Sequence, residues 1–255
     1  MSRRLAPLLG LLALLAALAP GAARAQDIVL ALSQSDVSIT ATFAGSRILV
    51  FGAIRNPPGG DTPLDVVVTV AGPLAPVTVR RKARVGGVWV NVEAAEIDAA
   101  PSFYAVATTA PLDEALTRTE DLRHAVSVPR AIRAVGSGAE EPQAFVDALI
   151  RIREADGHYV VAEGAVTLRE RALFRTDIAL PPDLVEGDYT ARAFLTREGR
   201  VLAVQSATLA VRKVGIERFL YRLAHESPAI YGVASLLIAG AAGWGASAAF
   251  RALRA

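Results

Sequence analysis

Apolar and polar positions alternate with a period of two over much of residues 28–109 and again over residues 165–211. This alternation predicts half-buried β-strands, because successive side chains of a strand point to opposite faces. Turn residues separate the runs, most clearly at Asn56–Pro63 and at Gly86–Gly87. The expected strands are 28–32, 37–43, 48–54, 64–71, 77–82, 88–92, 103–109, 165–168, 173–180, 189–196 and 201–211. The chain is therefore predicted to be mainly β.

One segment has a helical period instead. Phe145, Ala148, Leu149 and Ile152 recur at i, i+3, i+4 and i+7, which predicts an amphipathic helix over residues 142–156. The preceding residues 129–142 are rich in small and charged side chains and are interpreted as a boundary. The pattern predicts two immunoglobulin-like β-sandwich-type domains, residues 26–133 and a smaller unit of residues 134–214 that carries the helix.

The C-terminal part of the chain is apolar. Residues 227–250 contain no charged side chain for 24 positions. A helix of that length spans about 36 Å, enough to cross a hydrocarbon core of about 30 Å. We expect a transmembrane helix over residues 228–250, followed by a tail of residues 251–255. Residues 215–227 carry an apolar stripe, which favours a distinct juxtamembrane amphipathic helix. The alternative is that they form the first turns of the span, and Pro228 fits either a kink or a fresh helix start.

The N-terminus predicts export. Arg3 and Arg4 precede an apolar run that ends before Ala23-Arg24-Ala25, which is typical of a signal peptide over residues 1–25. The alternative, an uncleaved second membrane helix, requires a longer apolar run. Arginines in the tail favour a cytoplasmic C-terminus under the positive-inside rule. We expect a single-pass protein of a bacterial inner membrane with its N-terminal body in the periplasm.

Composition excludes several classes of protein. The 27 basic residues fall to 24 without the three arginines of the signal peptide, against 25 acidic residues, so the charge does not indicate a nucleic-acid partner. The absence of cysteine excludes disulfides and thiol chemistry.

No motif for catalysis, cofactor binding or metal binding is present. His124, His158 and His225 lack the spacing of metal ligands, and there is no nucleophile elbow or phosphate-binding glycine loop. His158 is interpreted as a helix-end residue. We therefore predict that the protein is not an enzyme and has no cofactor and no metal ligands. A hydrolase whose site is assembled from distant residues stays as a third hypothesis.

The densest positive charge outside the two termini lies in one predicted strand. Arg80, Lys82 and Arg84 would project from one face, with Arg81 opposite, and three cations on one face can bind an oxyanion or an anionic lipid headgroup. The alternative is a solvated face that protects an edge strand. Trp89, in the next strand, is interpreted as core packing in preference to a ligand platform.

Small residues recur every four positions in the predicted span. Ser235, Ala239, Gly243 and Ser247 lie on one side of the helix, where small side chains let another helix approach closely. The alternative is that an alanine-rich composition places them there by accident.

Several runs resemble a known family. Gly72-Pro73, the segments 79–91, 172–181 and 187–195, and above all GIERFLYRLAHESPAIYG over residues 215–232 are similar to an uncharacterised alphaproteobacterial family of single-pass transmembrane proteins. The resemblance implies no assigned activity. It does imply a membrane partner, because members of this family tend to be encoded beside permeases of the sulfite-exporter type.

These observations favour a membrane-anchored periplasmic accessory module for an inner-membrane partner, with contact or self-association through the span. The second hypothesis is a binding module for a small anion or anionic lipid that uses Arg80, Lys82 and Arg84. No nucleic-acid partner is expected.

Overall fold

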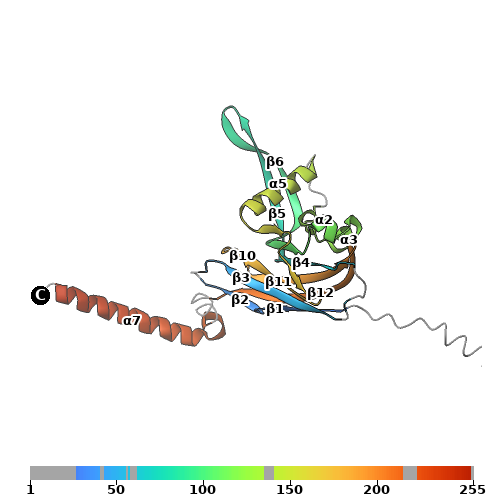
Figure 1. Ribbon diagram of the computed structural model, residues 1–255. Helices are drawn as coiled ribbons and strands as arrows, with labels where there is room; N and C mark the ends of the chain where they lie inside the picture. The colour runs from blue at the N-terminus through green and yellow to red at the C-terminus, as the bar shows by residue number, and fades with distance from the viewer. Residues whose placement is uncertain are drawn as a thin grey trace, which may run out of the picture.

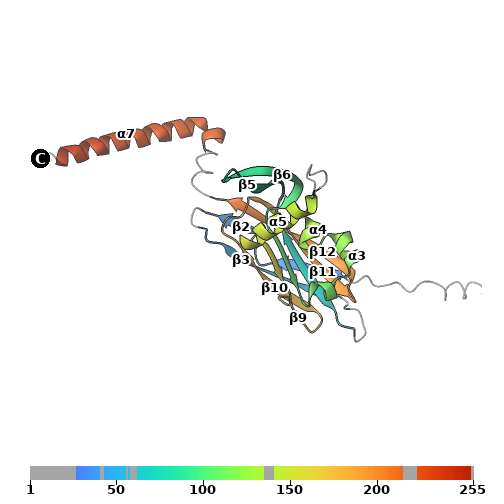
Figure 2. The same cartoon turned by 90° about the horizontal axis from the view of Figure 1, so that it is seen from above.

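Two β-sheets face each other and form the body of the molecule (Figures 1 and 2). The computed structural model describes residues 27–40, 43–55, 57, 62–134, 141–214 and 223–253. The four-stranded sheet has the order β1-β3-β10-β9, and the six-stranded sheet has the order β2-β12-β11-β4-β7-β8. Within them, β2 and β12 are parallel, β7 and β8 are parallel, and the other neighbours are antiparallel. The mainly β prediction is confirmed.

The strands of the smaller sheet are β1 (Asp27–Leu32), β3 (Ser46–Arg55), β9 (Thr167–Arg169) and β10 (Leu173–Leu180). Those of the larger sheet are β2 (Asp36–Ile39), β4 (Asp65–Ala71), β7 (Tyr104–Thr108), β8 (Tyr159–Ala162), β11 (Gly187–Arg197) and β12 (Arg200–Lys213). The turn between β11 and β12 uses Glu198 and Gly199, both at positive φ, as a two-residue hairpin turn requires.

The proposed division into residues 26–133 and 134–214 cuts through both sheets. β10 pairs with β3, β11 pairs with β4, and β8 pairs with β7, so each sheet contains strands from both predicted units. The described strands therefore form one β body in place of two. An immunoglobulin-like arrangement is not shown by this strand order. Periodicity identifies strands but carries no information on which strands pair over long distances, which is why the boundary was misplaced.

Two hydrophobic cores lie on opposite faces of the six-stranded sheet. The first core lies between the two sheets and contains Ile48, Phe174, Val68 and Leu195. The second lies on the far face and contains Val67, Val106 and Phe194. β7 is buried at all five of its positions, because both of its faces are covered.

Four helices cover the far face: α2 (Leu112–Ala115), α3 (Arg118–His124), α4 (Val128–Ala131) and α5 (Pro142–Ala155). The predicted helix over 142–156 corresponds to α5, which packs Phe145, Val146 and Leu149 into the second core. Gly157 follows the C-cap of α5, and its φ of 73° lets the Gly157 and His158 amides donate to the carbonyls of Glu154 and Arg153. The backbone of His158 therefore closes the helix, as its interpretation as a helix-end residue requires.

A separate hairpin stands on this helical side. β5 (Leu74–Val85) and β6 (Val88–Pro101) form a two-stranded sheet of their own, joined to the body by a bridge between Ala99 and Arg133, and the outer part of the hairpin stands clear of the body in Figure 1. The tight turn at Gly86 and Gly87 has φ values of 59° and 90°, which favour glycine. Both strands are longer than predicted.

The C-terminal helix α7 (Pro228–Leu253) is apolar and long enough to cross a membrane over residues 228–246. Residues 223–226 are helical, Ser227 is not, and α7 begins at Pro228, so the proline starts a new helix. The predicted signal peptide lies outside the described residues, as do residues 215–222 of the juxtamembrane segment.

Candidate functional site

The structure places Arg80, Lys82 and Arg84 on β5, all exposed. Their register partners on β6 are Ala94, Asn91 and Trp89. A register shift between Arg81 and Lys82 leaves an extra residue, Val92, on β6. The Arg84 Nε donates to the Gly87 carbonyl at 3.2 Å and so braces the turn. The three cations thus lie along the outer part of the hairpin and open to solvent.

Arg81 has a different role from its neighbours. It pairs with Glu93 at 3.1 Å across the hairpin and with Glu141 at 3.6 Å. Its guanidinium also lies 4.9 Å from the centre of the Phe145 ring of α5. Arg81 therefore joins the hairpin to the helical layer.

The end of the hairpin carries apolar side chains that nothing in the described structure covers. Trp89 is 66% exposed and Val88 is 65% exposed. We call the exposed group the apolar tip; its members are Val85, Val88, Trp89, Val90 and Val92. The interpretation of Trp89 as core packing was wrong, because the hairpin extends beyond the last layer that could bury it. Monomeric proteins rarely leave such a group exposed without a contact partner.

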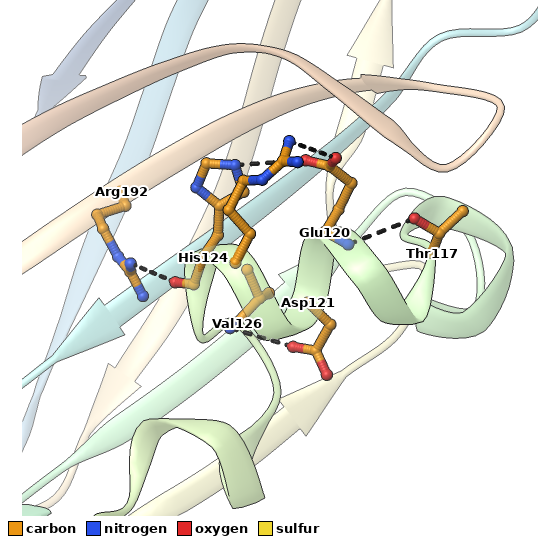
Figure 3. Close-up of polar contacts among 7 residues, drawn as sticks. Thr117, Glu120, Asp121, His124, Val126 and Arg192 are labelled. Atoms are coloured by element: carbon orange, nitrogen blue, oxygen red, sulfur yellow. Dashed lines mark hydrogen bonds and ion pairs between the residues drawn. The ribbon is translucent and has the colours of Figure 1, made fainter.

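A second cationic site, not predicted from the sequence, lies where β11 passes under α3. The Arg192 guanidinium donates to the His124 carbonyl at 2.8 Å, the Ala125 carbonyl at 3.1 Å and the Thr69 hydroxyl at 3.3 Å. Figure 3 shows Arg192 directed at the end of α3, where a cation is favoured by the helix dipole. The group is thus held in place by neutral oxygens.

The hydroxyl of Tyr104 extends this network. It accepts from Arg192 at 3.4 Å and donates to the Val126 carbonyl at 2.8 Å. Burial raises the pKa of Tyr104, and the charge of Arg192 opposes that shift only in part, so Tyr104 is a neutral hydroxyl. The adjacent Asp121 carboxylate accepts from the Val126 amide at 3.1 Å (Figure 3) and from the Ser127 amide at 2.7 Å.

Arg192 lines a pocket of about 390 Å³ together with two more arginines. Arg130 is on α4, and Arg133 follows it, fixed by two backbone hydrogen bonds to Ala99 of β6. We call this the arginine pocket; the rest of its lining is Ala71, Gly72, Leu74, Pro101, Tyr104, Ala125, Ala131 and Thr190. Sequence reasoning missed it because Arg192 is about sixty residues away in the chain from Arg130 and Arg133.

The histidines do not form a recognisable catalytic arrangement. The buried His158 has Nε2 at 3.3 Å from the Asp183 carboxylate. Its Nδ1 and the buried Ser102 hydroxyl have no hydrogen-bond partner among the described residues. A Ser-His pair in a triad is joined by a hydrogen bond, and Ser102 and His158 show none. His124 pairs with Glu120 at 3.4 Å in α3 (Figure 3).

In α7, Ser235, Ala239 and Gly243 lie on one side of an exposed helix. No atom of the described structure approaches within 4 Å of the position that a Cβ would take on Gly243. The side chain of Ser247 lies outside those that the structure describes. The small-residue face is therefore open where it is described.

Comparison with known proteins gives a family and little else. The model of a family described as "Putative transmembrane protein (Alph_Pro_TM)" matches residues 27–252. A search of curated proteins finds no match. Among solved structures, the sporulation control protein Spo0M from Bacillus subtilis is similar with 10% identity and a TM-score of 0.27, over 78% of this chain and 54% of that one. The chain thus spans about half of Spo0M, and a likeness this weak carries no argument.

Proposed function

The chain belongs to the Alph_Pro_TM family of transmembrane proteins, and from this premise we propose that it is a membrane-anchored interaction module that contacts a partner protein of the same membrane. In this proposal the β body is exported, α7 crosses the inner membrane, and the tail is cytoplasmic. The observation that carries the proposal is the apolar tip of the β5–β6 hairpin.

Apolar side chains on a hairpin that stands clear of the body are exposed to water unless a partner covers them. Two strands without a third are marginal in water, and among the described residues the outer parts of β5 and β6 pair only with each other. The inner part is supported by α5 through Arg81 and Phe145. The tip lacks such support and exposes Trp89, a residue type that is enriched at the energetic centres of protein interfaces. These features support a contact surface.

The span supplies a second surface for the same partner. In lipid, helices associate by close packing, which small residues permit. Ser235, Ala239 and Gly243 form an open face of this kind. Anchoring also confines the hairpin near the membrane, which raises its effective concentration toward a membrane-embedded partner.

Binding of anionic lipid is the second candidate function, and one observation favours it. Arg84 lies opposite Trp89 in register, and Arg80 and Lys82 lie on the same strand. Cations beside an aromatic ring suit a membrane interface, where the ring lies among headgroups and the cations meet phosphates.

Site-specific photo-crosslinking of the full chain in intact membranes separates the two candidates. A benzophenone amino acid in place of Val88 is expected to yield one discrete adduct with a multi-span membrane protein. The control carries the same group in place of Leu122, which is 64% exposed on α3, away from the tip. Adducts with lipid alone would favour the second candidate. Equal yields of protein adduct at both positions would contradict a tip-specific contact.

The small-residue face of α7 can be tested with one variant and a matched control. Gly243→Leu would push an apposed helix outward while keeping the segment apolar, so insertion should persist and co-purification of the partner should fall. Ala242→Leu adds a similar bulk off the Ser235–Gly243 line. An equal response to the two changes would mean that the face is an accident of composition.

A further inference from the structure

The arginine pocket carries an inference that goes beyond partner contact. We propose that it binds a phosphate or sulfate group of a small solute or headgroup, held by Arg130, Arg133 and Arg192. The site differs in position and construction from the exposed cations of the hairpin, Arg80, Lys82 and Arg84.

The first argument is charge. Three guanidinium groups and no carboxylate line the pocket. Among the described residues, no ion pair joins Arg130, Arg133 or Arg192 to an acidic side chain. Burial and, to a smaller extent, the nearby Asp121 raise the pKa of Tyr104, but the Asp121 carboxylate accepts from the Val126 and Ser127 amides and does not line the pocket. The described lining of the pocket thus carries net positive charge.

The second argument is preorganisation. The half-buried Arg192 is fixed by four neutral oxygens, those of Thr69, His124, Ala125 and Tyr104, and rests 5.2 Å from the Phe194 ring centre. Two backbone hydrogen bonds fix Arg133 to β6. The donors of Arg192 are largely engaged by these oxygens, so it contributes a positive charge in a fixed position. The exposed Arg130 and Arg133 supply forked donors that can each match two oxygens of a tetrahedral oxyanion.

The third argument is size. A cavity of about 390 Å³ lies near the lower end of the range for small-molecule sites. It is larger than one inorganic ion needs, and most of the remaining lining residues are small or apolar, among them Ala71, Gly72, Leu74, Pro101 and Ala131. The anionic group would therefore belong to a compact solute or to a lipid headgroup whose remainder lies over these walls.

Calorimetric titration of the full chain in a neutral maltoside detergent tests the proposal. Inorganic phosphate is the first probe, at constant ionic strength set with chloride so that non-specific screening stays fixed. Short-chain phosphatidylglycerol is the second. We expect saturable phosphate binding with a Kd of about 1 mM or tighter. Saturation by the lipid but not by phosphate would keep the site and assign its ligand to a headgroup.

Variants identify the site. Arg130→Gln with Arg133→Gln removes two exposed donors, and we expect the Kd to rise about tenfold or more. Arg151→Gln with Arg175→Gln removes the same charge from exposed positions of α5 and β10, outside the pocket lining, and should leave the Kd within about twofold. Arg130→Lys with Arg133→Lys keeps the charge and should recover part of the affinity.

Three results would overturn the proposal. One is the absence of saturable binding of either probe up to about 10 mM. Another is an unchanged Kd in the Arg130/Arg133 variant. The third is equal weakening in that variant and in the Arg151/Arg175 control, which would reduce the effect to net charge. Thermal melting of each variant checks that it is folded. If the variant with Arg130→Lys and Arg133→Lys does not fold, the single change Arg133→Lys takes its place.

Discussion

The inner and outer halves of the β5–β6 hairpin share a backbone structure but differ in their surroundings. In the inner half, residues 74–81 and 93–101, Ile97 and Ala95 are fully buried in the second core. In the outer half, residues 82–92, Val88 and Trp89 are about two-thirds exposed. The β5–β6 ladder runs through both halves from the Gly86–Gly87 turn. What differs is whether another layer of the protein reaches the apolar side chains, so the outer half is available to a partner.

The largest expected difference between the halves is in stability. Ile97→Ala should lower the free energy of unfolding by about 2–5 kcal/mol, because it removes buried methyl groups and leaves a cavity in the second core. Val88→Ala, in the outer half, should change it by less than about 0.5 kcal/mol. Denaturant titration of the two variants measures both values. A similar loss at Val88 would mean that the tip is packed against the rest of the chain, which would remove the reason to expect a partner there.

A smaller effect is expected where the inner half meets β8. The Tyr159 hydroxyl donates to the carbonyl of Pro101, the last residue of β6, at 2.8 Å. Burial raises the pKa of Tyr159 to about 12 from 10.0. Because the folded state then keeps a proton that the unfolded state loses, this tyrosine contributes stability that is present below pH 10 and is lost as the pH rises toward 12.

Tyr159→Phe should therefore cost about 1 kcal/mol at neutral pH, the value of a typical hydrogen bond. Above pH 10 the variant should lose less stability than the parent, so the two unfolding curves converge. Tyr104 and Tyr189 also have raised pKa values through burial, but they titrate in both proteins and cancel in the difference. If the difference in unfolding free energy between the parent and Tyr159→Phe stays constant up to pH 12, burial does not raise the pKa of Tyr159.

Arg81 lies at the junction of the two halves, and replacing it tests how the hairpin is joined to α5. Arg81→Gln removes the ion pairs to Glu93 and Glu141 and the contact with the Phe145 ring. Since the side chain is 46% exposed, solvent screens these interactions and we expect a loss of about 0.5–1 kcal/mol. Hydrogen exchange should rise in the outer half more than in the inner half. Uniform exchange rates along the hairpin would contradict a role for Arg81 as the junction.

Much of this architecture could be predicted because its signals are local. β10 matches its predicted range, and the β11–β12 turn follows from Glu198-Gly199. α3 was missed because it is short and polar, yet its signal was present. Thr117 is the N-cap and accepts from the Glu120 amide, the arrangement that Ser/Thr-x-x-Glu encodes.

The rest could not be predicted because it depends on long-range pairing. The arginine pocket forms only when β11 lies beside β4, with Arg192 opposite Thr69 in register, and α3 and α4 cover that face. No spacing along the chain encodes that arrangement. The exposure of Trp89 could not be predicted either. A strand has the same alternation of apolar and polar residues in its sequence whether or not a second layer covers it.

The smallest effect on stability is expected from the exposed cations of β5, of which Lys82 and Arg84 lie in the outer half and Arg80 lies at the end of the inner half. Changing Arg80, Lys82 and Arg84 together to Gln removes three exposed charges whose only described contact is the bond from Arg84 to the Gly87 carbonyl. The free energy of unfolding should change by less than about 0.5 kcal/mol. Any retention of the full chain on vesicles of phosphatidylglycerol over phosphatidylcholine should nonetheless fall, and the difference between parent and variant should shrink as salt rises. If vesicle retention is unchanged while stability drops, these side chains stabilise the fold of the hairpin and do not bind lipid. The outer half would then serve stability, as the inner half does.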